Sequence, residues 1–392
     1  MKVICTKAEL ARGLAIVGRA TSNRTHPILS TIKISTEQNR VQLEATNLEL
    51  GVQAYVEATV EQAGCCTLPA KLLTDFVNVL PHETITIEVP EAKHEGTITS
   101  ELSEAVITGM DPTEFPIWPQ VDGSGLSLVM DAQTFKEMIT DVAFSASTDD
   151  DNRPALTGIC IQVGREGCGK ITCAAADTYR LAVRSEVLEG DVPEPTELIV
   201  SAKTLKEVAT LLPSQGKVSI IVPPGQKQIL FQTASVNLTT RLMEARYPNF
   251  WQMVPGDYGT RAILETRLFT PMIKAAALFA QDASHTLTLT FKPSAGKITV
   301  FAEAAGIGAN TSTIGAAYSD PIPDFTMLFN VRYIAEVLTA VSSTPEIAFE
   351  LHNASRPGIL RPVGKKDVLY LVMPMQLKRE AKPRAATVGV AS

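Results

Sequence analysis

The sequence predicts an α+β protein built from three copies of one domain, each with two helices packed on a largely antiparallel sheet. Three observations support this fold class. A strand–helix–strand pattern recurs three times, roughly every 130 residues. A second amphipathic helix opens each copy, and short strands of alternating polarity fill the remainder. Helices gathered on one face of an antiparallel sheet are typical of α+β domains.

The strand–helix–strand pattern predicts one buried helix face in each copy, because apolar residues recur at helical spacing. The pattern occupies residues 66–89, 198–222 and 327–351. The apolar positions are Leu72, Leu73, Phe76 and Leu80, then Leu205, Val208 and Leu212, then Tyr333, Ile334, Val337 and Val341. The position that opens each helix holds Pro69, Ser201 or Asn330, all of which suit a helix start.

The second helix is predicted at residues 7–20, 131–145 and 265–280. Its apolar stripe is Leu10, Leu14 and Val17, then Phe135, Met138, Ile139 and Val142, then Leu268, Met272, Ala275 and Phe279. Proline-containing pairs, Phe115-Pro116 and Tyr247-Pro248, close the first two copies with extended segments. We therefore expect domains at residues 1–123, 124–257 and 258–377.

Composition places the chain among soluble globular proteins. It has 392 residues, 45% hydrophobic and 20% charged, and a net charge of −7. We expect a soluble intracellular protein, because no signal peptide or membrane-spanning run is present. The six cysteines show no zinc or disulfide spacing, so no metal or other cofactor is expected. The negative net charge excludes uniform coating of nucleic acid and leaves room for a local basic surface.

Two motifs suggest other functions. Residues 164–170 fit a phosphate-binding loop, yet Ile171 replaces the hydroxyl residue that would hold magnesium, and strands flank the loop on both sides. A hairpin turn is predicted there. Asp149-Asp150-Asp151-Asn152 suggests a cation site, but the rest of an EF-hand loop is missing, and we prefer a solvated loop. No catalytic residue is nominated.

Several segments together resemble the bacterial sliding clamps, the beta subunits of replicative DNA polymerases. They are the triplicated domain, Ala176-Asp177-Thr178-Tyr179-Arg180-Leu181, Tyr247-Pro248-Asn249-Phe250 with Val254-Pro255, and the segment from Tyr370 to Leu377. The resemblance implies that the chain forms half of a closed ring, the DNA clamp fold. Two copies would join head to tail as a homodimer, with helices lining the hole. A head-to-tail contact closes only when the rotation per subunit divides the circle.

The resemblance also implies a function without catalysis, as a processivity factor that encircles duplex DNA without sequence specificity. Sliding requires contacts to phosphates and not to base edges. The predicted helices have a small excess of positive charge although the whole chain is acidic. By resemblance, the DNA-binding residues are Arg24, Lys71, Arg153 and Lys203.

A pocket between domains 2 and 3 is the second surface that the resemblance implies. It would accept short peptide motifs from the replicative polymerase catalytic subunit, the clamp loader, other polymerases and repair proteins, in the bacterial cytoplasm at the nucleoid. The implied residues are Leu156, Thr178, Tyr179, Arg180, Leu181, Pro248, Gln252, Met253, Leu371, Met373, Pro374, Met375, Gln376 and Leu377. Methionine suits a groove that adapts to several partners.

The sequence departs from the usual family pattern at Thr178-Tyr179, Trp251-Gln252 and Gln376, so partner preference stays open. Residues 378–392 begin with basic residues and continue with small ones, and we expect them to be disordered. Two alternative functions also stay open. One is a metal-dependent hydrolase centred on Asp149 to Asp151. The other is a peptide-binding scaffold that does not bind DNA.

Overall fold

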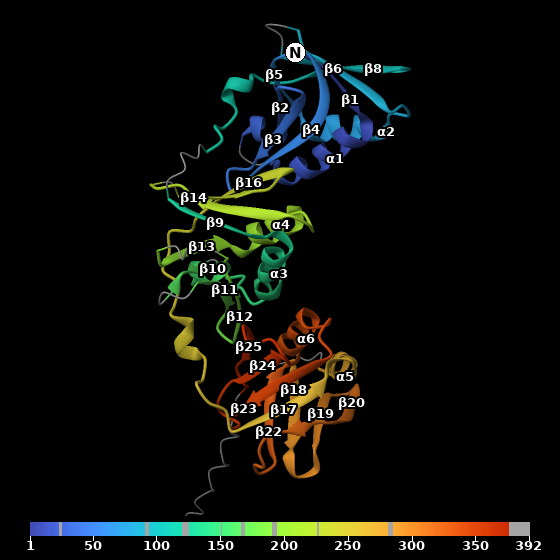
Figure 1. Ribbon diagram of the computed structural model, residues 1–392. Helices are drawn as coiled ribbons and strands as arrows, with labels where there is room; N and C mark the ends of the chain where they lie inside the picture. Colours follow the sequence, from blue (N-terminus) through green and yellow to red (C-terminus); the bar gives the residue numbers. More distant parts are fainter. Residues whose placement is uncertain are drawn as a thin grey trace, which may run out of the picture. The chain divides into compact units, whose positions relative to one another are not determined.

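The computed structural model describes residues 1–22, 26–90, 94–119, 125–149, 151–165, 169–189, 194–225, 227–280 and 285–375 (Figure 1). The chain forms two compact units. Unit 1 contains Met1–Asp177 and Val183–Pro248. Unit 2 contains Thr178–Ala182 and the described part of Asn249–Ser392. The predicted tail at 378–392 lies outside the described residues.

The same order of elements occurs three times: strand, helix, four strands, helix, three strands. Repeat 1 contains β1 (Lys2–Thr6), α1 (Lys7–Val17), β2 (Thr31–Glu37), β3 (Arg40–Thr46), β4 (Leu50–Gln62), β5 (Cys65–Pro69), α2 (Ala70–Val79), β6 (Thr84–Glu88), β7 (Glu95–Ser100) and β8 (Ser103–Thr108). Repeat 2 contains β9 (Leu126–Asp131), α3 (Ala132–Ala143), β10 (Gly158–Val163), β11 (Lys170–Ala176), β12 (Arg180–Val187), β13 (Thr196–Ser201), α4 (Ala202–Leu211), β14 (Lys217–Val222), β15 (Gln228–Gln232) and β16 (Val236–Arg241).

Repeat 3 keeps this order and adds one short strand, β21. It contains β17 (Thr260–Glu265), α5 (Thr266–Phe279), β18 (Thr286–Lys292), β19 (Lys297–Ala304), β20 (Gly308–Gly315), β21 (Ala317–Tyr318), β22 (Phe325–Asn330), α6 (Val331–Ala340), β23 (Glu346–Leu351), β24 (Gly358–Pro362) and β25 (Val368–Val372). The helices pack in pairs within each repeat, α1 with α2, α3 with α4 and α5 with α6 (Figure 1). The predicted triplicated α+β architecture is confirmed.

A twelve-stranded sheet joins repeats 1 and 2 within unit 1. Its main path runs β8-β7-β6-β1-β4-β16-β15-β14-β9, and β2, β3 and β5 branch from it. The two repeats meet where β4 pairs antiparallel with β16, with Leu50 opposite Thr240 and Ala54 opposite Val236. We name this β4–β16 pairing the first joint. Unit 2 contains two runs of hydrogen-bonded strands, in the orders β25-β24-β23-β17-β21 and β20-β19-β18-β22.

The core of repeat 1 depends on a glycine inside a helix. Leu10, Leu14 and Val17 of α1 are buried, as the sequence predicts. A Cβ on Gly13 would lie 2.7 Å from Val56 Cγ2 and 2.8 Å from Leu43 Cδ1, both on strands beneath the helix. Glycine costs about 1 kcal/mol in a helix interior relative to alanine. Here it allows α1 to approach the sheet closely.

The predicted stripe of α5 is wrong by one position. The buried residues of α5 are Thr266, Phe269, Ile273 and Ala276, whereas Leu268 and Leu278 are exposed. This helix is apolar on more than one face, so periodicity alone did not identify the face that meets the sheet. In α2, Leu72 is likewise exposed, and Val77 is buried in its place.

Other local predictions have mixed outcomes. The side chain of Asn330 accepts a hydrogen bond from the backbone N–H of Arg332 and caps α6, as expected. Ser201 stands at the start of α4, but its side chain makes no capping hydrogen bond. The glycine-containing segment at 164–170 connects the antiparallel pair β10 and β11, and the Gly164 N–H donates to the Lys170 carbonyl. The predicted hairpin is therefore confirmed.

We expect Gly13→Ala to lower the free energy of unfolding by about 1 kcal/mol, because overpacking a core costs about 1–3 kcal/mol and exceeds the gain in helix propensity. Urea denaturation of the intact chain measures this change. Gly18→Ala is the matched control, because Gly18 has a helical φ of −56° and a Cβ added there would meet no heavy atom within 4 Å. Equal stability of the two variants would contradict close packing of α1 at Gly13.

Candidate nucleic-acid interface and peptide-binding residues

Three helices carry a basic residue at the same position of their first turn. Lys71, Lys203 and Arg332 are the second residues of α2, α4 and α6, and all three are exposed. None of these first turns contains an acidic residue. A cation near a helix N-terminus opposes the helix dipole, and anions are favoured there. The position thus suits binding of an external anion better than it suits helix stability.

Sequence reasoning selected Lys71 and Lys203 and missed Arg332. The repeat itself was the available signal, because Arg332 follows Asn330 as Lys71 follows Pro69 and Lys203 follows Ser201 with the same spacing. The two predicted lysines lie in unit 1 and Arg332 lies in unit 2.

The other predicted DNA-binding residues are Arg153 and Arg24. Arg153 is exposed and precedes a short 3₁₀ helix at Pro154–Thr157. Arg24 lies outside the described residues. Several helix carboxylates are paired with arginine: Glu9 with Arg12, Glu207 with Arg19, and Asp141 with the buried Arg184. These pairs offset negative charge on the helices.

Two backbone hydrogen bonds fix the segment Met373–Met375 within unit 2. The Met373 N–H donates to the Tyr179 carbonyl at 2.8 Å, and the Met375 N–H donates to the Leu328 carbonyl at 2.7 Å. Pro374, between them, has no N–H to satisfy. The segment therefore continues past β25 in a defined position beside Thr178–Ala182.

An aromatic and charged cluster stands beside this segment. The rings of Tyr179 and Tyr333 stack with centroids 6.3 Å apart. The Arg180 guanidinium lies 4.5 Å from the Tyr333 centroid and forms an ion pair with Glu336 of α6. A cation–π contact contributes about 0.5–1 kcal/mol at an exposed site and about 2 kcal/mol when the cation is desolvated, and only 10% of the Arg180 side chain is exposed. Sequence reasoning treated Tyr333 only as a core residue and did not mention Glu336, because neither motif nor periodicity links them to Arg180.

The predicted peptide-binding residues divide into exposed and buried groups. Tyr179, Met253 and Met373 expose 56%, 44% and 40% of their surfaces. Leu181 and Leu371 are buried. Gln252 is exposed on the 3₁₀ helix Phe250–Met253, and Thr178 is exposed as well. Pro374 and Met375 are half-buried, whereas Gln376 and Leu377 lie outside the described residues.

Two predicted peptide-binding residues, Leu156 and Pro248, belong to unit 1. Leu156 is buried at the end of the turn before β10, and Pro248 is exposed. The preceding residue, Tyr247, is buried, and its hydroxyl accepts a hydrogen bond from the Ala176 N–H at 3.0 Å. Burial raises the pKa of this hydroxyl. The bond holds the closing segment of repeat 2 against the end of β11.

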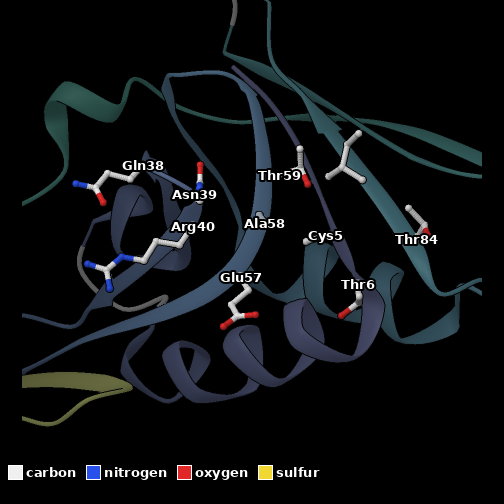
Figure 2. Close-up of a pocket in the computed structure, with 10 residues that line it drawn as sticks. Cys5, Thr6, Gln38, Asn39, Arg40, Glu57, Ala58, Thr59 and Thr84 are labelled. Carbon is white, nitrogen blue, oxygen red and sulfur yellow. The ribbon is translucent and has the colours of Figure 1, made fainter.

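A broad groove of about 840 Å³ opens in repeat 1, where β4 leaves β3 and begins to pair with β1 (Figure 2). Its lining is mostly polar and includes Gln38, Asn39, Arg40 and Glu57. Cys5 also lines it, and burial raises the pKa of that thiol to about 11. The thiol is therefore protonated at neutral pH and is a poor nucleophile.

Within the described ranges, no helix is long and apolar enough to cross a membrane. In the same part of the chain, no three His, Cys, Asp or Glu side chains are placed to hold a metal ion. Of the candidate cation loop, Asp150 is outside that part. Asp149 accepts hydrogen bonds from the backbone N–H and side-chain amide of Asn152, and these bonds hold its pKa below the usual value.

Three family models match successive parts of the chain. The N-terminal, central and C-terminal domains of the DNA polymerase III beta subunit match residues 1–119, 129–249 and 251–376. A beta sliding clamp from Synechocystis is 31% identical over 96% of this chain and 100% of its own length. The chain belongs to the beta sliding clamp family.

Further relatives agree with this assignment. The beta sliding clamp of Bacillus subtilis is 27% identical over 96% of this chain and all of its own length. The crystal structure of the DNA polymerase sliding clamp from the same organism superimposes with a TM-score of 0.89, at 26% identity, over 96% of this chain and 99% of that one. The family resemblance and the clamp fold inferred from the sequence are confirmed.

Proposed function

We propose that this chain is a DNA polymerase processivity factor that encircles duplex DNA as a homodimer and tethers replication proteins to it. The repeat-equivalent cations Lys71, Lys203 and Arg332, on the fold of a sliding clamp, carry this proposal. A clamp acts by topology, so we assign no catalytic step to the chain. Its work would take place in the bacterial cytoplasm, at the nucleoid.

The DNA contacts in this proposal are to phosphates. Lys71, Lys203 and Arg332 add their charge at helix N-termini, where the helix dipole also favours an anion, and this combination favours phosphate oxygens. Arg153 extends the proposed basic surface from a loop, and Arg24 remains part of the predicted set. Phosphate contacts position a protein on a duplex without reading its sequence, so the ring can slide.

The first joint provides a template for joining two copies. There, β4, the fourth strand of repeat 1, pairs with β16, the last strand of repeat 2. The corresponding strands elsewhere are β20, the fourth of repeat 3, and β8, the last of repeat 1. Each ends a run of paired strands in the described sheets. We propose that β8 of one copy pairs with β20 of the next, because open sheet edges require a partner or protection.

Exposed apolar side chains surround both strands of this proposed contact. Val106 on β8 and Val79 on α2 expose 61% and 75% of their surfaces. Leu278 on α5 and Ile307 beside β20 expose 62% and 71%. Large exposed apolar residues grouped in this way mark interaction surfaces. The outer apolar face of α5, which misled the sequence prediction, is explained by burial against a second copy.

The peptide-binding role rests on the exposed side chains of Tyr179, Met253 and Met373 and on the fixed segment Met373–Met375. We propose that the predicted set binds short motifs from the polymerase catalytic subunit, the clamp loader, other polymerases and repair proteins. Methionine is flexible and polarisable, so such residues accommodate different peptides.

We retain the domain limits 1–123, 124–257 and 258–377 as part of the proposal.

Replacing Lys71, Lys203 and Arg332 with alanine in the assembled protein is expected to weaken DNA binding equally for all sequences. The slope of log K against log salt should fall by about 1 for each phosphate that the protein no longer neutralises. Fluorescence anisotropy with duplex DNA at several salt concentrations measures it. Lys227→Ala is the control, because Lys227 pairs with Glu244 outside the helices. An unchanged slope in the triple variant would contradict phosphate binding at the helix starts.

Retention of the loaded protein on circular but not on linear duplex DNA is the direct test of encirclement. Equal loss from both substrates would reject the ring and leave a peptide-binding scaffold as the better description. Metal-dependent turnover that disappears in Asp151→Ala would instead support a hydrolase.

Val106→Lys and Leu278→Lys should each raise the dissociation constant of the dimer at least 100-fold, because an unpaired buried charge costs several kcal/mol and about 1.4 kcal/mol is tenfold. Light scattering coupled to size-exclusion chromatography reports the mass. Val187→Lys, at an equally exposed position in repeat 2, should leave the dimer intact. Monomers from the control, or dimers from both interface variants, would argue against the β8–β20 contact.

Met373→Asp should reduce capture of the purified polymerase catalytic subunit at least tenfold without changing the mass of the clamp. The carboxylate would be desolvated on contact with an apolar peptide side chain. Surface plasmon resonance on immobilised clamp measures capture. Tyr258→Ala, also exposed in unit 2, is the control. Full capture by Met373→Asp would reject the assigned residues.

A further inference from the structure

The backbone arrangement at the first joint is the same as the one around Tyr179 and Met373, two of the residues proposed to bind peptide. In repeat 2, the turn Ala176-Asp177-Thr178-Tyr179 connects β11 to β12. In repeat 1, the turn Thr46-Asn47-Leu48-Glu49 connects β3 to β4. The Arg241 N–H donates to the Glu49 carbonyl at 3.3 Å, just as the Met373 N–H donates to the Tyr179 carbonyl at 2.8 Å. Glu49 and Arg241 are therefore the repeat equivalents of Tyr179 and Met373.

A cavity of about 190 Å³ lies at this position, entirely within unit 1. We name it the first-joint groove. Its walls come from the β3–β4 turn, from β15 and β16, and from the extended segment at 116–119. The segment at 116–119 follows Phe115 and closes repeat 1, just as the segment after Tyr247 closes repeat 2. The turn, the closing segment and Arg241 of this groove therefore all have counterparts in repeats 2 and 3.

An aromatic platform forms one wall of the groove. The Trp118 indole is half-buried and lies over Gly51, where an added Cβ would stand 3.0 Å from the indole Cζ3 and 2.6 Å from Thr239 Cγ2. The neighbouring Ile117 exposes 91% of its surface. An indole face beside an exposed aliphatic side chain is the kind of surface that binds apolar groups.

Leu48 contributes a strained apolar side chain to the rim. Its φ is +72°, in the left-handed region that leucine rarely adopts, and 39% of its surface is exposed. Asn47 stabilises the turn, since its side-chain oxygen accepts from the backbone N–H groups of Glu49 and Leu50. A glycine at position 48 would fit this backbone without strain. Strain of this kind in a fixed turn is often associated with a binding role for the side chain.

The charges distinguish this groove from its counterpart. The exposed Glu49 contributes a carboxylate and the exposed Arg241 a guanidinium, whereas Glu44 is buried and bonded to Gln53, and burial raises the pKa of its carboxyl. Among the described residues, Glu49 and Arg241 form no side-chain ion pair. The equivalent positions, Tyr179 and Met373, are uncharged. The exposed carboxylate of Glu49, which has no ion-pair partner among the described residues, favours a basic group in the ligand.

We propose that the first-joint groove is a second peptide-binding site, which takes a linear partner segment with aliphatic side chains beside a lysine or arginine. The aliphatic side chains pack on Trp118, Ile117 and Leu48, and the basic group meets Glu49. The choice of a peptide as ligand rests on the proposed function, because Glu49 and Arg241 are the repeat equivalents of Tyr179 and Met373, which are proposed to bind peptide. The preference for a basic segment rests on this groove alone.

Trp118 is a built-in reporter, because the chain has only two tryptophans. In the full-length dimer with Trp251→Phe, Trp118 is the single emitter. The probes are two synthetic peptides that differ in one residue, acetyl-GLKLG-amide and acetyl-GLELG-amide. We expect a saturable change in Trp118 emission with the lysine peptide and a dissociation constant at least tenfold lower than with the glutamate peptide. A response that does not saturate, or equal affinities, would overturn the proposal.

Two variants in this background test the named side chains. Glu49→Lys should reverse the preference between the two peptides. Leu48→Gly should weaken the lysine peptide at least fivefold, while its thermal unfolding midpoint stays equal or rises, because glycine relieves the left-handed strain. Unchanged affinities in both variants would overturn the assignment, and the thermal measurement separates lost binding from lost folding.

Met373→Asp separates this inference from the proposed function. It should leave the Trp118 titration unchanged, whereas Glu49→Lys should leave capture of the polymerase subunit unchanged. If Met373→Asp does not affect polymerase capture, the proposed peptide-binding residues fail and the first-joint groove still stands on its own titration. A synthetic peptide of residues 378–392 is a further competitor. If it binds the first-joint groove more tightly than the lysine peptide and displaces it, the ligand is the chain's own terminus and the assignment of a partner segment is overturned.

Discussion

The antiparallel pairing of β4 with β16 is the interaction on which the rest of the structure depends. It joins the strands of repeats 1 and 2 into one sheet, because residues 50–54 of β4 pair with residues 236–240 of β16. The same pairing places the β3–β4 turn against the end of β16, and this contact forms the walls of the first-joint groove. One backbone contact therefore determines both the connection between repeats and the surface beside it.

Helix starts are the second constraint. Each of α2, α4 and α6 begins directly after a strand, so its N-terminus has a fixed place at the end of that strand. A lysine or arginine at that place weakens the helix slightly and strengthens attraction to an anion. In the proposed function, sequence-independent contact with DNA would therefore require no special motif. It would follow from repeating one unfavourable charge at equivalent positions of a triplicated domain.

Much of this fold can be predicted from the sequence, because the three repeats give three independent copies of each pattern of apolar residues. Leu10, Leu14 and Val17, or Phe135, Met138 and Val142, identify a buried helix face without ambiguity. Leu72 of α2 is one exception, and the α5 helix is the larger one, since apolar residues on two of its faces satisfy the helical period equally well. Which face meets the sheet depends on tertiary contacts that a local pattern does not contain.

The candidate site was less predictable than the fold. Thr178, Tyr179 and Met373 were found only through family resemblance, because a short apolar segment near the end of a chain has many structural explanations. The partners of Arg180, namely Tyr333 and Glu336, lie far away in sequence and are brought to it by folding. Arg332 was within reach of the repeat alignment, whereas the strain at Leu48 is a property of backbone geometry and left no sequence signal.

The long strand β4 has a consequence for how such chains diverge. Its thirteen residues pair with β3, β1 and β16. Inserting one residue in its middle would invert the inward and outward faces of everything beyond the insertion and break more than one ladder at once. Length changes between homologues should therefore accumulate in hairpin tips, while β4 diverges only by substitution.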